Sequence, residues 1–168
     1  NRLAWLAILM LSATFTGRII QHFDDALQSV VILAAFIPML MDTGGNAGSQ
    51  SSTSVIRGLA LNEIDTKDTL KIIKKEFGVS IMAGVSLAVL NAGRLAFIEK
   101  VDLMVNIAVN LSLICTIVMA KITGGVLPIL AKKINTDPAL MAGPLITTIV
   151  DAVALIIYFS FAVWLLNI

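Results

Sequence analysis

The most informative segment of this sequence reads Pro38-Met-Leu-Met-Asp42-Thr43-Gly44-Gly45-Asn46-Ala-Gly48-Ser49-Gln50-Ser-Ser-Thr53-Ser54-Val-Ile-Arg57. It places glycines, amides, a carboxylate and a row of hydroxyls directly after an apolar run. In lipid, irregular backbone is tolerated only where protein buries it or where it lines an aqueous cavity. We therefore interpret this segment as one wall of a polar pathway.

The composition outside this segment is that of a membrane protein. Apolar residues make up 58% of the 168 residues and charged residues only 14%, which a soluble domain of this length would not show. The formal net charge of +1 gives no reason to expect a nucleic-acid partner. We expect a single all-α transmembrane domain over residues 1–168, in contact with membrane lipid.

Five apolar spans can be drawn along the chain. They are Leu3–Ile20, Leu27–Leu61, Phe77–Phe97, Leu103–Leu130 and Ala139–Leu166. The second span is too long for one straight crossing, so we expect it to bend or to continue into water. Pro38 and Gly44-Gly45 are the expected places for a bend. Residues 62–76 read as a polar helix capped by Asp65, whose charges we interpret as a solvated surface.

Loop charges predict the orientation of these spans in the cell membrane. The linkers after spans two and four are rich in lysine and arginine, whereas the opposite loops hold only Arg18, Arg94 and Lys100. Basic loops remain in the cytoplasm, so we expect a cytoplasmic N-terminus and an extracytoplasmic C-terminus.

Asp151 is the strongest single candidate for a functional residue, because it lies deep in span five. An ionised carboxylate at the bilayer centre costs at least about 2.5–3.5 kcal/mol, so such residues face a protein interior or a water-filled path. Helical spacing places Pro144, Thr147 and Ala154 on the same stripe as Asp151. The alternative is a structural pair with Lys121 or an amide of span four.

Two motifs resemble those of the MgtE family of magnesium channels. The first is Gly44-Gly45-Asn46-Ala47-Gly48-Ser49-Gln50, preceded by Pro38 and followed by Arg57-Gly58-Leu59. The second is Asp137-Pro138 followed by Gly143-Pro144-Leu-Ile-Thr147-Thr148-Ile-Val-Asp151, which is similar to the last transmembrane helix of that family. The resemblance covers nearly the whole chain, with the two motifs in the right order.

This resemblance implies an Mg²⁺-selective channel, not an enzyme, in which a homodimer lines one central pore with its second and fifth helices. It also implies cytosolic regulatory domains ahead of Asn1, so we expect this chain to be a fragment. Mg²⁺ prefers oxygen ligands and sheds its waters reluctantly, which suits recognition of the hydrated ion by carboxylates, amides and hydroxyls. One Asp151 per chain balances half of a divalent charge, so two chains sharing the ion would neutralise it.

The predicted site combines both motifs. The expected metal ligands are Asp151, Asp137 and Asp42, and the expected pore-lining residues are Thr43, Gly44, Gly45, Asn46, Gln50, Pro144, Thr147, Thr148 and Ala154. Alternatives remain for several of them. The glycines also fit a small-residue helix-packing motif, Asp137 also fits a helix cap before Pro138, and Asp42 could pair with a basic residue instead.

Three other functions are alternatives to the channel. A divalent cation transporter coupled to H⁺ or Na⁺ would use the same Asp151. An intramembrane enzyme would need a catalytic pair, for which Asp42 and Asp151 are the only candidates, and their sequence context differs from that of membrane aspartyl proteases. A membrane-anchoring domain without transport would leave Asp151 unexplained.

Overall fold

The computed structural model describes residues 2–141 and 143–168, and every element in them is helical. The elements in chain order are α1 (Arg2–His22), α2 (Asp24–Ser29), η1 (Val31–Phe36), α3 (Ile37–Ala60), η2 (Thr66–Asp68), α4 (Thr69–Arg94), η3 (Leu95–Glu99), α5 (Leu103–Lys133), η4 (Pro138–Met141) and α6 (Pro144–Leu166). The all-α fold class is confirmed.

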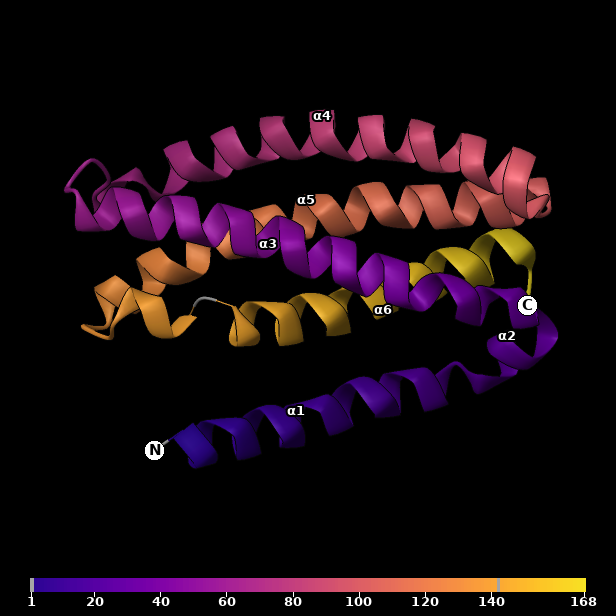
Figure 1. The fold of residues 1–168 in the computed structure, drawn as a ribbon, viewed down its shortest axis with the longest axis horizontal. Helices are drawn as coiled ribbons and strands as arrows, with labels where there is room; N and C mark the ends of the chain where they lie inside the picture. The colour runs from indigo at the N-terminus through magenta and orange to yellow at the C-terminus, as the bar shows by residue number, and fades with distance from the viewer. Residues whose placement is uncertain (1, 142) are drawn as a thin grey trace.

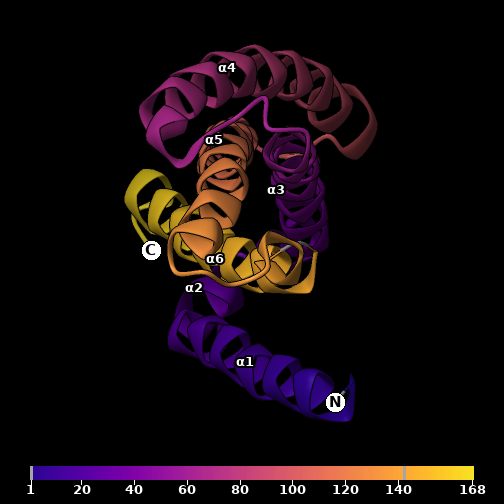
Figure 2. The ribbon, with the colours of Figure 1, turned by 90° about the vertical axis from the view of Figure 1, so that its left-hand side faces the viewer.

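The long helices run back and forth along one axis (Figure 1). α5 lies at the centre and packs against α3, α4 and α6, while α3 also packs against α6. Seen along the axis, α4 arches over α3 and α5, and α1 lies on the far side of α6 and contacts it (Figure 2). α1 begins at one end of the bundle, and α6 ends at the other (Figure 1).

Four segments of the described chain are long and apolar enough to cross a membrane. They are Val31–Ala60, Thr66–Glu99, Leu103–Lys133 and Pro144–Leu166. α1 has 21 residues, or roughly 31 Å at 1.5 Å per residue, which also matches a hydrocarbon core of about 30 Å. The chain is thus a multi-pass membrane protein, and a fifth crossing by α1 remains a prediction.

Glycines bring α3 close to the central helix. A methyl group at Gly124 of α5 would overlap the backbone carbonyl of Gly48 in α3. A methyl group at Gly44 would lie 2.7 Å from Cγ2 of Thr116 and 2.8 Å from Cγ1 of Val150 in α6. These distances are below van der Waals contact, so only glycine permits this approach.

The predicted bend of the second span lies earlier than Gly44-Gly45. α3 is a continuous α-helix through both glycines, and the break falls at Val30 and the 3-10 turn η1, with Pro38 in the first turn of α3. Placing the bend at the glycines was therefore wrong, because their carbonyls remain in the helix. The hydroxyl of Tyr158 donates to the carbonyl of Leu33 at 2.9 Å and stabilises the break.

Two other boundaries differ from the sequence prediction. The polar helix and the third span form one helix, α4, which begins at Thr69. The last span begins at Pro144 rather than Ala139, after η4 and a positive-φ Gly143; residue 142 lies outside the described residues.

The predicted cap at Asp65 is confirmed, and the backbone N–H of Thr66 lowers the pKa of the Asp65 carboxyl group.

We predict that Gly124→Ala lowers the thermal unfolding midpoint of the purified protein in detergent. The added methyl meets backbone of α3, which cannot rotate away, and overpacking of this kind costs about 1–3 kcal/mol. Gly78→Ala is the matched control, because nothing lies within 4 Å of its new methyl. Equal midpoints for the two variants would contradict the close contact between α3 and α5.

Candidate functional site

The α3 helix has two faces of opposite character. Its buried face is made of small and apolar residues, including Gly44, Gly48 and Val55, which pack into the bundle. Its other face carries Asp42, Asn46, Gln50, Thr53 and Arg57 at intervals of three or four residues, and all five are exposed in the single chain. Helical periodicity therefore places the polar groups of the motif in one continuous stripe.

A cavity of about 440 Å³ lies where this stripe meets α6, and we call it the carboxylate cavity. Its lining residues are Ile37, Pro38, Met41, Asp42, Gly45, Asn46, Thr147 and Asp151. Both intramembrane aspartates of the predicted site therefore face one space. Among the described residues, neither aspartate forms an ion pair with a basic side chain.

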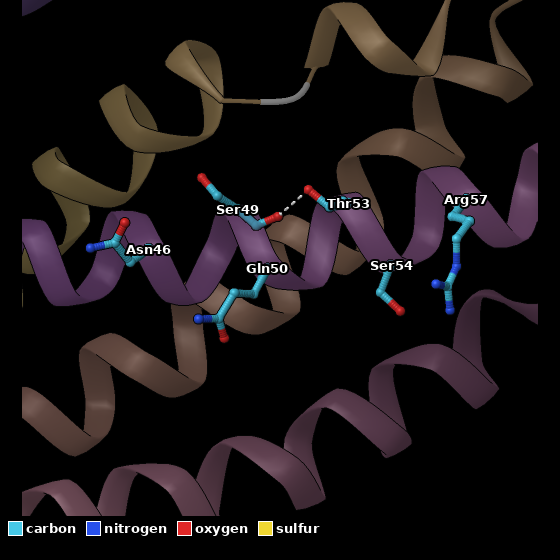
Figure 3. A pocket seen from close by; sticks show the side chains of 6 residues that line it. All are labelled: Asn46, Ser49, Gln50, Thr53, Ser54 and Arg57. Atoms are coloured by element: carbon cyan, nitrogen blue, oxygen red, sulfur yellow. Dashed lines mark hydrogen bonds between the residues drawn. The ribbon is translucent and has the colours of Figure 1, made fainter.

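A second cavity, of about 650 Å³, continues along α3, and we call it the amide–hydroxyl cavity. It is lined by Asn46, Ser49, Gln50, Thr53, Ser54 and Arg57 (Figure 3). Asn46 lines both cavities, so the two are neighbours along one helix. Thr53 donates to the carbonyl of Ser49 at 2.9 Å, while the amides of Asn46 and Gln50 have no hydrogen-bond partner within the described chain.

Several of the predicted pore-lining residues do not line either cavity. Gly44 and Ala154 lie inside the bundle, with Ala154 only 1% exposed, and neither lines these two cavities. Thr43, Pro144 and Thr148 also lie outside both linings. The hydroxyls of Thr147 and Thr148 both donate to the carbonyl of Pro144 at 2.9 Å, which stabilises the first turn of α6.

Asp137 lies apart from the other two aspartates. Its Oδ1 accepts the backbone N–H of Ala139 at 2.9 Å, so it caps the short turn η4. It lines a separate cavity of about 240 Å³ with Lys132 and the last turn of α3. The carboxylate is exposed, and no contact joins it to the carboxylate cavity.

Sequence reasoning missed part of the polar stripe. Ser49, Thr53, Ser54 and Arg57 line the amide–hydroxyl cavity, although none was among the predicted site residues. Counting in steps of three and four from Asp42 through Asn46 would have reached Ser49, Thr53 and Arg57.

A buried carboxylate in α4 was also missed. Glu76 is only 6% exposed, and Ser51 of α3 donates to its Oε2 at 2.5 Å. Interpreting it as part of a solvated surface was wrong, because α4 turns this residue toward α3 and Gly125 of α5.

The asparagines Asn106 and Asn110 of α5 link helices. Asn91 of α4 donates to Asn110 at 3.0 Å, and Asn110 donates to Asn106 at 2.7 Å. Arg94 extends this network by donating to Asn91 at 3.1 Å and pairing with Glu99. These side chains therefore join α4 to α5 and do not line the two cavities.

The carboxylate cavity offers oxygen ligands of the kind that hard cations prefer. Within residues 2–141 and 143–168, no group of three or more His, Cys, Asp or Glu side chains lies close enough together to hold a metal. Two carboxylates, an amide and a hydroxyl suit a cation that keeps most of its water shell and is released again.

Known proteins match this chain along nearly all of its length. A family model described as MgtE, divalent cation transporter, matches residues 37–161. The chain is 38% identical over 166 residues to the magnesium transporter MgtE of Thermus thermophilus, covering 99% of this chain and 36% of that protein. It is 40% identical over 162 residues to the magnesium transporter MgtE of Bacillus subtilis, covering 96% and 36%. The chain thus spans about a third of the length of these relatives.

We predict that Mg²⁺ stabilises the purified protein through the carboxylate cavity. At 100 times its Kd, a cation bound only to the folded state adds about 2.7 kcal/mol. Asp42→Asn and Asp151→Asn should each reduce the Mg²⁺-dependent rise of the thermal midpoint, whereas Asp25→Asn in the exposed α1–α2 region should not. An equal rise in all four proteins would place the bound ion elsewhere.

Proposed function

The chain belongs to the MgtE family of divalent cation transporters, and on this premise we propose that it forms a channel that conducts hydrated Mg²⁺ across the membrane. The observation that carries the proposal is the carboxylate cavity, in which Asp42 and Asp151 meet at membrane depth. The relatives are magnesium transporters by name, and Mg²⁺ is the cargo we assign to this chain.

The size of the cavity supports recognition of the ion with its water shell. Six waters at about 30 Å³ each occupy roughly 180 Å³, which fits within the cavity of about 440 Å³. Carboxylate, amide and hydroxyl groups can all accept or donate hydrogen bonds to those waters. The ion then enters and leaves without losing its shell, which Mg²⁺ does reluctantly.

Electrostatics favours a cation at this point. Each ionised carboxylate at the bilayer centre costs at least about 2.5–3.5 kcal/mol, and two like charges in one cavity repel each other. A divalent cation offsets both costs. From Asn46 onward, the neutral amides and hydroxyls of α3 continue the polar route without adding charge as far as Arg57.

A second copy of the chain is the partner we propose. Asp42, Asn46, Gln50 and Thr53 are exposed on α3, and polar groups at membrane depth cannot face lipid. A two-fold dimer that joins these faces would cover them and enclose the route. The argument from charge is weaker than the sequence suggested, because one chain already contributes two carboxylates to the cavity.

The proposed orientation follows the basic linkers. The connection from α3 to α4 and the one from α5 to α6 lie at the same end of the bundle as the N-terminus (Figure 1). We assign this end to the cytoplasm, following the positive-inside rule. Regulatory cytosolic domains remain an expectation for the longer protein.

Coupled transport is the second candidate function. A second carboxylate beside Asp151 favours it, because two close carboxylates can share a proton and exchange it for a cation. Flux of Mg²⁺ into liposomes without any H⁺ or Na⁺ gradient supports the channel. A strict need for either gradient supports the transporter.

We predict that Asp151→Asn lowers Mg²⁺ uptake into liposomes at least tenfold while the protein stays folded. The change removes a charge that balances the ion but keeps the shape of the side chain. An inert hexammine cation, which imitates a hydrated ion, should also inhibit wild-type uptake. Wild-type rates in the variant would refute the role of Asp151, and insensitivity to the hexammine ion would favour direct coordination.

We predict that a single cysteine at Thr147, with Cys115 replaced, forms cross-links between two chains under oxidation. Thr147 lines the carboxylate cavity, which the dimer would place next to the two-fold axis. The control is a cysteine at Met82 of α4, whose side chain is 74% exposed on the outer surface of the bundle. Cross-linking at Met82 but not at Thr147 would exclude the shared pore.

A further inference from the structure

A fourth cavity lies between the end of α3 and the first turns of α4, away from the carboxylate cavity. It has a volume of about 260 Å³, and we call it the basic pocket. Its cations are Arg57 of α3 with Lys71 and Lys75 of α4. Lys71 and Lys75 are four residues apart, so they project from one face of the helix toward the same space.

The three cations have no carboxylate partner. No ion pair within 4 Å involves any of them in the described part of the chain. Two carboxylates, Glu63 and Asp68, also line the pocket, but Asp68 already accepts the backbone N–H of Asp65 at 2.9 Å in the cap of η2. Positive charge therefore exceeds negative charge in the pocket and is available to an anion.

The apolar wall of the pocket is packed against the end of α3. Ile64 covers Gly58 so closely that a methyl group at Gly58 would overlap it, which holds the connection over the end of α3. Ile72 forms the apolar floor and is 6% exposed, packed with Val55 and Leu59. A preformed pocket lowers the ordering cost of binding.

The sequence around the pocket is that of a helix end near a membrane surface. Leu61 is 60% exposed and Leu70 is 64% exposed, and they lie close in the chain to Arg57 and Lys71. The chain passes here from the polar start of α4 to its apolar continuation. Basic pockets between transmembrane helices at this depth bind the head groups of anionic lipids.

We propose that the basic pocket binds the phosphate of an anionic phospholipid in the leaflet at this end of the bundle. The phosphate would lie among Arg57, Lys71 and Lys75, and the acyl chains would run past Leu70 along α4. Soluble phosphate shares this chemistry but would gain nothing from the exposed leucines. The inference concerns a lipid site and does not depend on which ion the chain conducts.

The test measures binding of phosphatidylglycerol to the purified, delipidated protein by native mass spectrometry. The double variant Lys71→Gln/Lys75→Gln should bind it about 30-fold more weakly. Lys74→Gln is the matched control, because Lys74 is exposed on the same helix but does not line the pocket; its affinity should equal that of the wild type. Glu63→Gln should bind about fivefold more tightly, a gain that misfolding cannot imitate.

Unchanged affinity in the double variant, or an equal loss in Lys74→Gln, would overturn the proposal, because either result means unspecific attraction to surface charge.

A second titration tests whether the ligand is a lipid or a soluble anion, and it adds millimolar inorganic phosphate. Failure of phosphate to displace the lipid supports the headgroup assignment, and displacement would identify a soluble anion as the ligand instead. Phosphatidylcholine, which is neutral overall, should bind no better to the wild type than to the double variant.

Discussion

The close approach of α3 to α5 and α6 is the contact on which the rest of the structure depends. The backbones meet at Gly48 and Gly124, and Gly44 accommodates Thr116 and Val150. Lipid provides no hydrophobic drive for helices to associate, so close packing of small residues must hold them together. Packing of this face fixes the rotation of α3 about its axis. The opposite face, with Asp42, Asn46 and Gln50, is therefore turned away from α5.

The same contact explains why glycine and polar residues alternate in one motif. α3 packs against its neighbours with one face and presents polar groups on the other. Residues three or four positions apart lie on the same face, so Gly44 and Gly48 are buried while Asp42 and Asn46 line the carboxylate cavity. Glycines and polar residues thus alternate in the sequence of the motif but lie on two separate faces of α3.

The polar groups of the apolar helices are of two kinds: some are buried and hydrogen-bonded, and others line a cavity. Glu76 and the asparagines Asn91, Asn106 and Asn110 are buried and hydrogen-bonded, so they join helices. Asp42 and Asp151 have no such partner among the described residues and face a cavity. This difference separates polar groups that join helices from those that remain available to water or a cation.

The sequence by itself determined the membrane class, the helical content and the MgtE family, because composition and short motifs are local properties. It also identified the cap at Asp65. Only the tertiary structure decided that α3 runs unbroken through Gly44-Gly45, that Asp42 joins Asp151 in one cavity, and that Asp137 does not. It likewise decided that Glu76 is buried against Ser51. These outcomes depend on which face each helix turns toward its neighbours, and that rotation is set by contacts between residues far apart in the chain.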